Sequence, residues 1–152
     1  MRRKSFRDER CAIARTLDVV GEWWTLLILR DAFSGLTRFS EFQQSLGMAK
    51  NVLSARLQKL VENGILELSP AGDGSAYQQY GLTEKGRSLF TILVALRQWG
   101  EANLLEEGEV DVVLVDRQNK MPVRKLELRS AKGTLLGVSD LTLQSRATDD
   151  KQ

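Results

Sequence analysis

The 152-residue sequence contains no histidine and a single cysteine, Cys11. These shortages exclude an internal disulfide, a zinc site built from cysteine and histidine, and a histidine general base. No acidic cluster has the spacing of metal ligands, so we expect neither a metal nor another cofactor. Apolar runs such as Leu26–Leu29 are far shorter than the roughly 20 residues of a membrane-spanning helix. Because no apolar signal segment follows the basic N-terminus, we expect a cytoplasmic protein without membrane contact.

Charge is distributed unevenly along the chain, although the net charge is only +2. Residues 1–60 contain 11 Lys and Arg against 6 Asp and Glu, whereas residues 61–152 contain 11 against 14. A positive excess confined to one half is typical of a segment that binds an anionic partner. The distribution therefore favours a nucleic-acid partner for the first half of the chain.

Hydrophobic periodicity predicts four helices in the first 63 residues, each followed by a glycine. The second is apolar almost all round and is therefore expected at the centre of the core. Ser40, with Gln43 three positions later, has the spacing of a capping box and predicts the start of the third helix. The expected helices cover residues 11–20, 22–34, 40–46 and 50–63.

A hairpin and a long helix are predicted next. Apolar residues on either side of the segment "PAGDGS" indicate two strands joined by a flexible tip, between residues 65 and 82. Thr83 is placed to cap a helix over residues 84–105. This order of elements predicts a winged helix-turn-helix domain, an α+β fold that is mostly helical and has a β-hairpin wing.

The last third of the chain has a different character. After the acidic stretch "EANLLEEGEVD", the segments "VDVVLV", "VRKLELR" and "TLLGVSDLTL" have the composition of strands. We therefore expect a DNA-binding and dimerisation domain over residues 1–106, a small β-rich extension over 107–145 and a disordered tail over 146–152. The extension could cover the core, extend a dimer or bind an effector.

The helix expected over residues 50–63 is the candidate for the major groove of DNA. Its outer side begins with short polar residues and is nearly free of acid. Asn51 can bond adenine, the methyl groups of Val52 can touch thymine, and Ala55 permits a close approach. Lys50 and Arg56 suit phosphate oxygens. The simpler alternative is the solvated face of an ordinary amphipathic helix. Four apolar residues share its inner side: Leu53, Leu57, Leu60 and Val61.

The segments "CAIARTLDVVGEWWTLLILRDAFSGLTRFSEF", "LSARLQKLVENGIL" and "YGLTEKGRSLFTILVALRQWG" resemble the HxlR-type branch of the MarR-like bacterial transcriptional regulators. The resemblance extends from about Cys11 to Gly100. It implies a homodimer, held by the N- and C-terminal helices, that binds an inverted-repeat operator on double-stranded DNA. We expect this regulator to act as a repressor. The resemblance places the recognition helix at Lys50–Asn63 and the wing at Leu66–Leu82.

Two positions depart from the family pattern. Ala49 stands where a hydroxyl residue usually caps the recognition helix, which costs that helix roughly 1 kcal/mol. The wing tip has no Lys or Arg and carries Asp73, so few wing contacts are expected. The candidate DNA-binding residues are Arg38, Ser40, Lys50, Asn51, Val52, Ser54, Ala55, Arg56, Gln58, Lys59, Ser75 and Gln78.

Some HxlR-type regulators sense quinones, aldehydes or oxidants through a cysteine at the position of Cys11. Arg7, Arg10 and Arg15 are close in sequence, and cationic neighbours near a helix start favour the reactive thiolate. A reversible disulfide of the lone cysteine can join only two subunits, or the chain and a small thiol. An oxidant or small-molecule effector is therefore expected. The alternative is that Cys11 is a small buried hydrophobe.

The interpretation is thus a dimeric DNA-binding regulator whose two recognition helices enter successive major grooves roughly 34 Å apart. The alternative is a winged-helix protein-interaction module without DNA binding, which the acidic wing tip favours. An enzyme is not expected, because no nucleophile–base pair or phosphate-binding glycine loop is visible.

Overall fold

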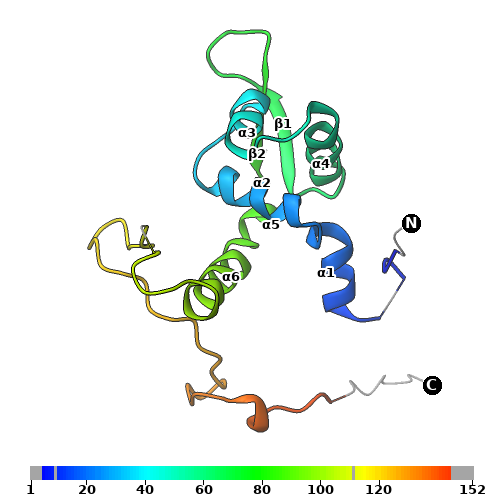
Figure 1. Cartoon of the computed structure of the whole chain (residues 1–152). Helices are drawn as coiled ribbons and strands as arrows, with labels where there is room; N and C mark the ends of the chain where they lie inside the picture. The colour runs from blue at the N-terminus through cyan, green and yellow to red at the C-terminus, as the bar shows by residue number, and fades with distance from the viewer. Residues whose placement is uncertain (1–4, 9, 111, 145–152) are drawn as a thin grey trace, which may run out of the picture. The chain divides into compact units, whose positions relative to one another are not determined.

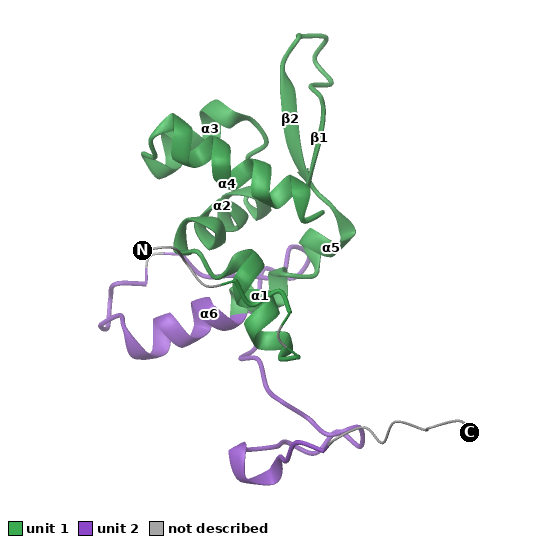
Figure 2. Cartoon of the chain, turned by 90° about the vertical axis from the view of Figure 1, so that its right-hand side faces the viewer, with its two compact units in different colours: residues 1–94 green, residues 95–152 purple. Residues whose placement is uncertain are grey.

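The computed structural model describes residues 5–8, 10–110 and 112–144. It forms two compact units, residues 1–94 and 95–152 (Figure 2). The order of helices and a two-stranded hairpin confirms the predicted winged helix-turn-helix fold (Figure 1). The elements of the first unit are α1 (Ala12–Val20), α2 (Trp23–Phe33), α3 (Phe39–Leu46), α4 (Lys50–Glu62), β1 (Leu66–Pro70), β2 (Gln78–Leu82) and α5 (Glu84–Arg87), and α6 (Phe90–Asn103) begins in this unit and ends in the second.

The core of the first unit is built around α2, as predicted. Ile28 and Leu29 of this helix are fully buried, although Trp23 at its first position is mostly exposed. Each such buried side chain stabilises the fold by about 1.5–3 kcal/mol relative to an exposed one. The other fully buried side chains come from α3, α4 and β1: Phe42, Leu53, Leu57, Leu60 and Leu66.

Helix α3 begins one residue before the predicted Ser40. Arg38 is its N-cap, and the carboxylate of Glu41 accepts hydrogen bonds from the backbone N–H groups of Thr37 (2.8 Å) and Arg38 (2.9 Å). The capping-box prediction for Ser40 and Gln43 is therefore wrong, because Glu41 occupies the third helical position and reaches back. The two backbone hydrogen bonds lower the pKa of Glu41. This arrangement fixes Arg38 at the exposed start of the helix.

The predicted wing is the β1–β2 hairpin. Its antiparallel register extends from Leu66 opposite Leu82 to Pro70 opposite Gln78. The base of the hairpin is attached to the domain, because Leu66 is buried and the backbone N–H of Tyr80 donates to the carbonyl of Thr37 at 2.7 Å. The wing therefore has a fixed base beside the start of α3.

The long helix predicted over residues 84–105 is divided in two. Thr83 caps α5 as predicted, accepting a hydrogen bond from the Gly86 N–H at 2.9 Å, but a turn at residues 88–89 separates α5 from α6. A Cβ atom on Gly86 would lie 2.1 Å from the carbonyl oxygen of Ile65, so α5 is packed directly on the backbone at the hairpin base. This contact fixes the first helical turn, and α6 begins anew at Phe90, whose ring lies 4.9 Å from that of Phe33.

The second unit has little regular structure after α6. The predicted strands of residues 110–143 are reduced, among the described residues, to isolated bridges at Val115–Pro122 and Arg129–Leu135, with a short 3-10 helix at Val138–Asp140. None of the described residues between 95 and 144 is buried. The strand prediction is wrong for the chain taken alone, because no packed surface supports longer ladders.

The predicted division at residues 106–107 stays a prediction, and the predicted disordered tail lies outside the described residues. Within the described ranges, no helix is long and apolar enough to cross a membrane.

Candidate nucleic-acid interface

Helices α3 and α4 form the helix-turn-helix. Gly47 ends α3 in the left-handed conformation (φ +63°), and the side chain of Met48 is buried in the turn. Ala49 is the N-cap of α4 and supplies no side-chain hydrogen bond, as the sequence predicts. The N–H groups of the first turn of α4 are therefore not covered by a cap, and they create a positive helix end that favours anions.

The opening turns of α4 are exposed on one side, and Leu53, Leu57 and Leu60 are buried on the other. The recognition-helix prediction depends on this division, because a duplex can reach only an uncovered helix face. The structure brings together six of the predicted DNA-binding residues there, all exposed: Lys50, Asn51, Val52, Ser54, Ala55 and Gln58.

Arg56 and Lys59, also predicted to contact DNA, are engaged inside the first unit. The guanidinium of Arg56 donates to the Glu22 carboxylate at 2.6 Å, and the two side chains are only 27% and 24% exposed. The Lys59 ammonium donates to the backbone carbonyl of Asp18 at 2.8 Å. These two cations therefore tie α4 to the end of α1 and the start of α2. A phosphate could bind Arg56 only at the expense of its pair with Glu22.

The start of α3 is linked to the wing tip. The Arg38 guanidinium donates to one carboxylate oxygen of Asp73, while the other oxygen accepts hydrogen bonds from the Ser75 N–H (3.0 Å) and hydroxyl (2.6 Å). The bonds from Ser75, followed by the Arg38 interaction, lower the pKa of Asp73 to about 2. The bonds between Asp73 and Ser75 could have been predicted from the sequence, because Asp-x-Ser spacing is typical of a turn closed by an aspartate side chain.

A shallow groove lies between the start of α3 and the start of β2. Its volume is about 460 Å³, which lies within the size range of small-ligand clefts. Its lining brings the predicted residues Arg38, Ser40 and Gln78 together, beside the exposed ring of Tyr77. Tyr77 was missed by the sequence reasoning, which treated it only as part of a strand. Its position in the sequence, close to the predicted flexible tip, could have indicated an exposed aromatic ring at this surface.

Cys11 is exposed and lies at the N-cap of α1. Its backbone carbonyl accepts a hydrogen bond from the Arg15 N–H at 3.1 Å. The alternative of a buried, purely hydrophobic cysteine is therefore wrong. In the described part of the chain, no three Cys, Asp or Glu side chains gather as metal ligands would.

The chain is similar to several known proteins, of which three are described here and in the next paragraph. Rv3095 of Mycobacterium tuberculosis, described as an HTH-type transcriptional regulator, is 45% identical over 100 residues, which are 66% of this chain and 63% of that protein. The chain thus spans less than two thirds of the length of this relative. The crystal structure of PA1607 has a TM-score of 0.89 and 49% identity, covering 94% of this chain and 100% of that one.

A more distant similarity is to the redox regulator HypR. Its oxidized form has a TM-score of 0.57 and 30% identity, and the match covers 63% of this chain and 100% of that chain. The family of HxlR-like helix-turn-helix proteins matches residues 19–108, which include α2–α6 and the wing. Because this match covers more than half of the sequence, the chain belongs to the HxlR-like helix-turn-helix family.

Proposed function

We propose that the protein is a homodimeric transcriptional repressor that binds an inverted-repeat operator with α4 in the major groove. The observation that carries the proposal is the exposed opening of α4, where Lys50, Asn51 and Ser54 lie beside an uncapped helix end. Membership of the HxlR-like helix-turn-helix family supports it. Two such helices, related by a two-fold axis, would occupy successive major grooves about 34 Å apart.

Within α4, we assign different roles to neighbouring side chains. The Asn51 amide reads an adenine through two hydrogen bonds, and Val52 contacts a thymine methyl group. Lys50 and the first backbone N–H groups of the helix bind phosphate. Ser54 and Gln58 face the same groove, and the small side chain of Ala55 allows the helix to approach the base edges.

Phosphate contacts continue in the groove between α3 and β2. Ser40 and Gln78 can donate hydrogen bonds to phosphate oxygens, and Arg38 can do so when Asp73 releases it. Ser75 contributes mainly by shaping the tip, because it donates both its N–H and its hydroxyl to Asp73. Arg56 and Lys59 hold α4 in position from its inner flanks.

The deciding experiment is a binding titration with the purified full chain. Fluorescence anisotropy would compare a palindromic fragment from the region upstream of its gene with a scrambled duplex, over a series of salt concentrations. We expect tighter binding to the palindrome and a steep loss with salt, because neutralised phosphates release counterions. Binding to neither duplex at low salt would instead support the protein-interaction alternative.

We further propose that oxidation of Cys11 controls this binding. Its exposure at the start of α1 supports the proposal, as does the similarity to HypR, a redox regulator solved in both reduced and oxidized forms. A peroxide would oxidise the thiolate to a sulfenic acid, which condenses with a second thiol and releases water. Mass spectrometry of the oxidised chain, with operator affinity measured in parallel, tests the switch. Complete modification of Cys11 with unchanged affinity would refute it.

A further inference from the structure

Tyr77 presents an exposed aromatic ring from a fixed position on the wing. The Ala71 N–H donates to the Tyr77 carbonyl at 2.8 Å, which continues the hairpin one step beyond the pair of Pro70 and Gln78. Ala71 is buried, whereas Tyr77 is 71% exposed. Because its backbone is already held, Tyr77 loses little conformational freedom when a partner covers its ring. The residue is therefore suited to binding.

The tip that precedes Tyr77 is closed by its own side chains and carries no free charge. Asp73 accepts hydrogen bonds from the Ser75 N–H and hydroxyl, and the same carboxylate binds the Arg38 guanidinium at the start of α3. While this ion pair holds, the groove beside it offers an aromatic surface with hydroxyl and amide groups rather than a free cation. The residues that line the groove are Arg38, Phe39, Ser40, Tyr77 and Gln78.

The wing belongs to the end of the first unit that carries the recognition helix. In both views the wing, α3 and α4 lie at one end of this unit, and α1 and α5 lie at the other (Figure 1, Figure 2). A duplex that α4 enters by its major groove meets this end, so its backbone can reach the wing. That backbone alternates charged phosphates with uncharged deoxyribose rings. Ser40 and Gln78 suit the phosphates, and the face of an aromatic ring suits the C–H surface of a sugar.

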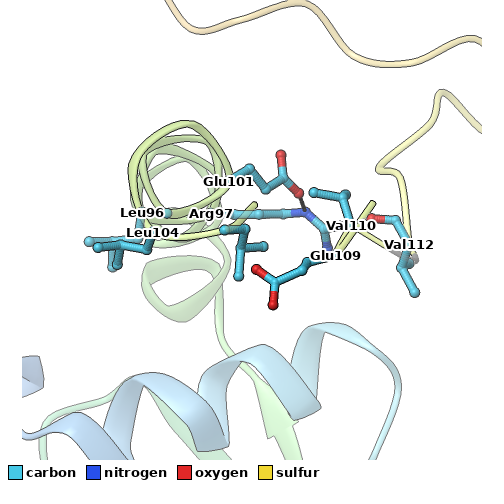
Figure 3. A pocket seen from close by; sticks show the side chains of 9 residues that line it. Leu96, Arg97, Glu101, Leu104, Glu109, Val110 and Val112 are labelled. Carbon is cyan, nitrogen blue, oxygen red and sulfur yellow. Dashed lines mark hydrogen bonds and ion pairs between the residues drawn. The ribbon is translucent and has the colours of Figure 1, made fainter. Parts of the chain in front are cut away.

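A depression on α6 has the wrong charge for DNA. It has a volume of about 390 Å³, and Leu96 and Leu104 form one of its walls (Figure 3). Its cation, Arg97, is already paired with Glu101, and Glu109 adds a second carboxylate to the lining. This hollow is apolar and negative overall, so it does not continue a nucleic-acid surface. The groove at Tyr77 is the one that suits a duplex.

We propose that the Tyr77 ring packs on a deoxyribose of the operator backbone and gives the wing an uncharged DNA contact. This inference rests on the proposed function, because its partner is the same duplex. It departs from the basic wing of the family pattern, which the acidic tip of this chain lacks. The contact buries apolar surface and neutralises no phosphate, so its contribution to the affinity should not depend on salt.

Anisotropy titrations of full-length variants over a salt series test this contact. Tyr77→Ala should lower operator affinity about tenfold at every salt concentration, as expected for roughly 50 Å² of apolar surface left unburied. The slope of log affinity against log salt should stay unchanged. Tyr77→Phe keeps the ring and should bind like the unmodified protein. An equal loss in both variants would overturn the proposal, because the phenolic hydroxyl would then be the contacting group.

Leu68→Ala is the matched control. It removes a 42% exposed apolar side chain from β1 of the same wing, outside the groove lining, and we expect unchanged affinity. Thermal unfolding midpoints should stay close to that of the unmodified protein for Tyr77→Ala, because the altered side chain is mostly exposed. Equal losses of affinity in Leu68→Ala and Tyr77→Ala would overturn the specific role of Tyr77.

Hydroxyl-radical footprinting locates the contact, because these radicals attack deoxyribose directly. The unmodified protein should protect sugars at the outer edge of each half-site, and Tyr77→Ala should lose this protection while the sugars beside α4 stay protected. A protein that binds the palindrome, with affinity and footprint unchanged by Tyr77→Ala, would overturn the contact and leave the proposed function intact. Failure of the unmodified protein to bind any duplex would overturn both.

Discussion

Arg38, the N-cap of α3, forms an ion pair with Asp73 at the wing tip, 35 positions later in the chain. The pair joins the start of α3 to the wing, the two elements that line the groove of Arg38, Ser40 and Gln78. It also neutralises the Arg38 guanidinium, which could otherwise bind a phosphate group. The acidic wing tip is therefore part of the candidate interface, since it determines whether Arg38 is free.

Removing this carboxylate should strengthen DNA binding. We expect Asp73→Asn to raise the affinity for operator and random duplex alike, by several-fold at low salt, and to steepen the salt dependence by about one phosphate contact. Anisotropy titrations over a salt series measure both quantities. Asp116→Asn makes the same change of charge in the turn at residues 116–120, where Asp116 accepts hydrogen bonds from Gln118 and Asn119, and is the control. Equal gains from the two variants would mean that net charge alone is responsible.

Asn51 should determine one position of the operator. Asn51→Ala is expected to lose about 1–3 kcal/mol of discrimination at one base pair, because the adenine loses its paired hydrogen bonds. Asn63→Ala is the matched control, since Asn63 lies at the other end of α4 and donates to the Lys59 carbonyl. Binding measured against a panel of single-base operator variants provides the comparison. A similar pattern of preferences in both variants would contradict the role of Asn51.

The Arg56–Glu22 pair should stabilise the position of α4. One oxygen of Glu22 and the Nε of Arg56 are buried without a hydrogen-bond partner in the described structure, so removal of either side chain leaves a poorly solvated charge. We expect Arg56→Ala to lower the free energy of unfolding by about 1–3 kcal/mol and Glu22→Gln to weaken DNA binding as well. Urea unfolding and anisotropy test these effects. Tighter binding by Glu22→Gln would show that Arg56, once released, contacts phosphate directly.

The packing of α5 on the hairpin base should tolerate no side chain at Gly86. Gly86→Ala would place a methyl group against the Ile65 carbonyl. We expect this substitution to lower the free energy of unfolding by about 1–3 kcal/mol. Gly100→Ala is the control, because a Cβ there meets no atom within 4 Å and Ala favours the helix by up to about 1 kcal/mol. Thermal unfolding should therefore shift in opposite directions. A Gly86→Ala protein with an unchanged midpoint would contradict the close contact.

Much of the first unit could be predicted because its determinants are local. The spacing of Leu53, Leu57 and Leu60 and the glycine after each helix define the helices, and turn residues define the wing. The same periodicity identified which side of α4 is exposed. The predicted start of α4 and the absence of a side-chain cap at Ala49 are confirmed for the same reason.

One error was local, and the others occurred where contacts between residues distant in the sequence decide the structure. Ser40 has a suitable cap spacing, but Glu41 reaches the backbone in front of the helix. Nothing in helical periodicity reveals that Gly86 will pack on Ile65 and interrupt a long helix. Arg56 and Lys59 have the charge of phosphate ligands, yet their partners, Glu22 and Asp18, lie more than thirty residues earlier.

The two links from α4 to Glu22 and Asp18 have a consequence for signalling. Helix α1, nine residues and therefore about 13 Å long, is anchored at the end near Asp18 and begins beside the exposed thiol of Cys11. A modification of the thiol would displace the free end of α1, while its other end stays attached to α4. Under the proposed control by Cys11, such a displacement would reach α4 through the bond of Lys59 to the Asp18 carbonyl, without a ligand bound in the core.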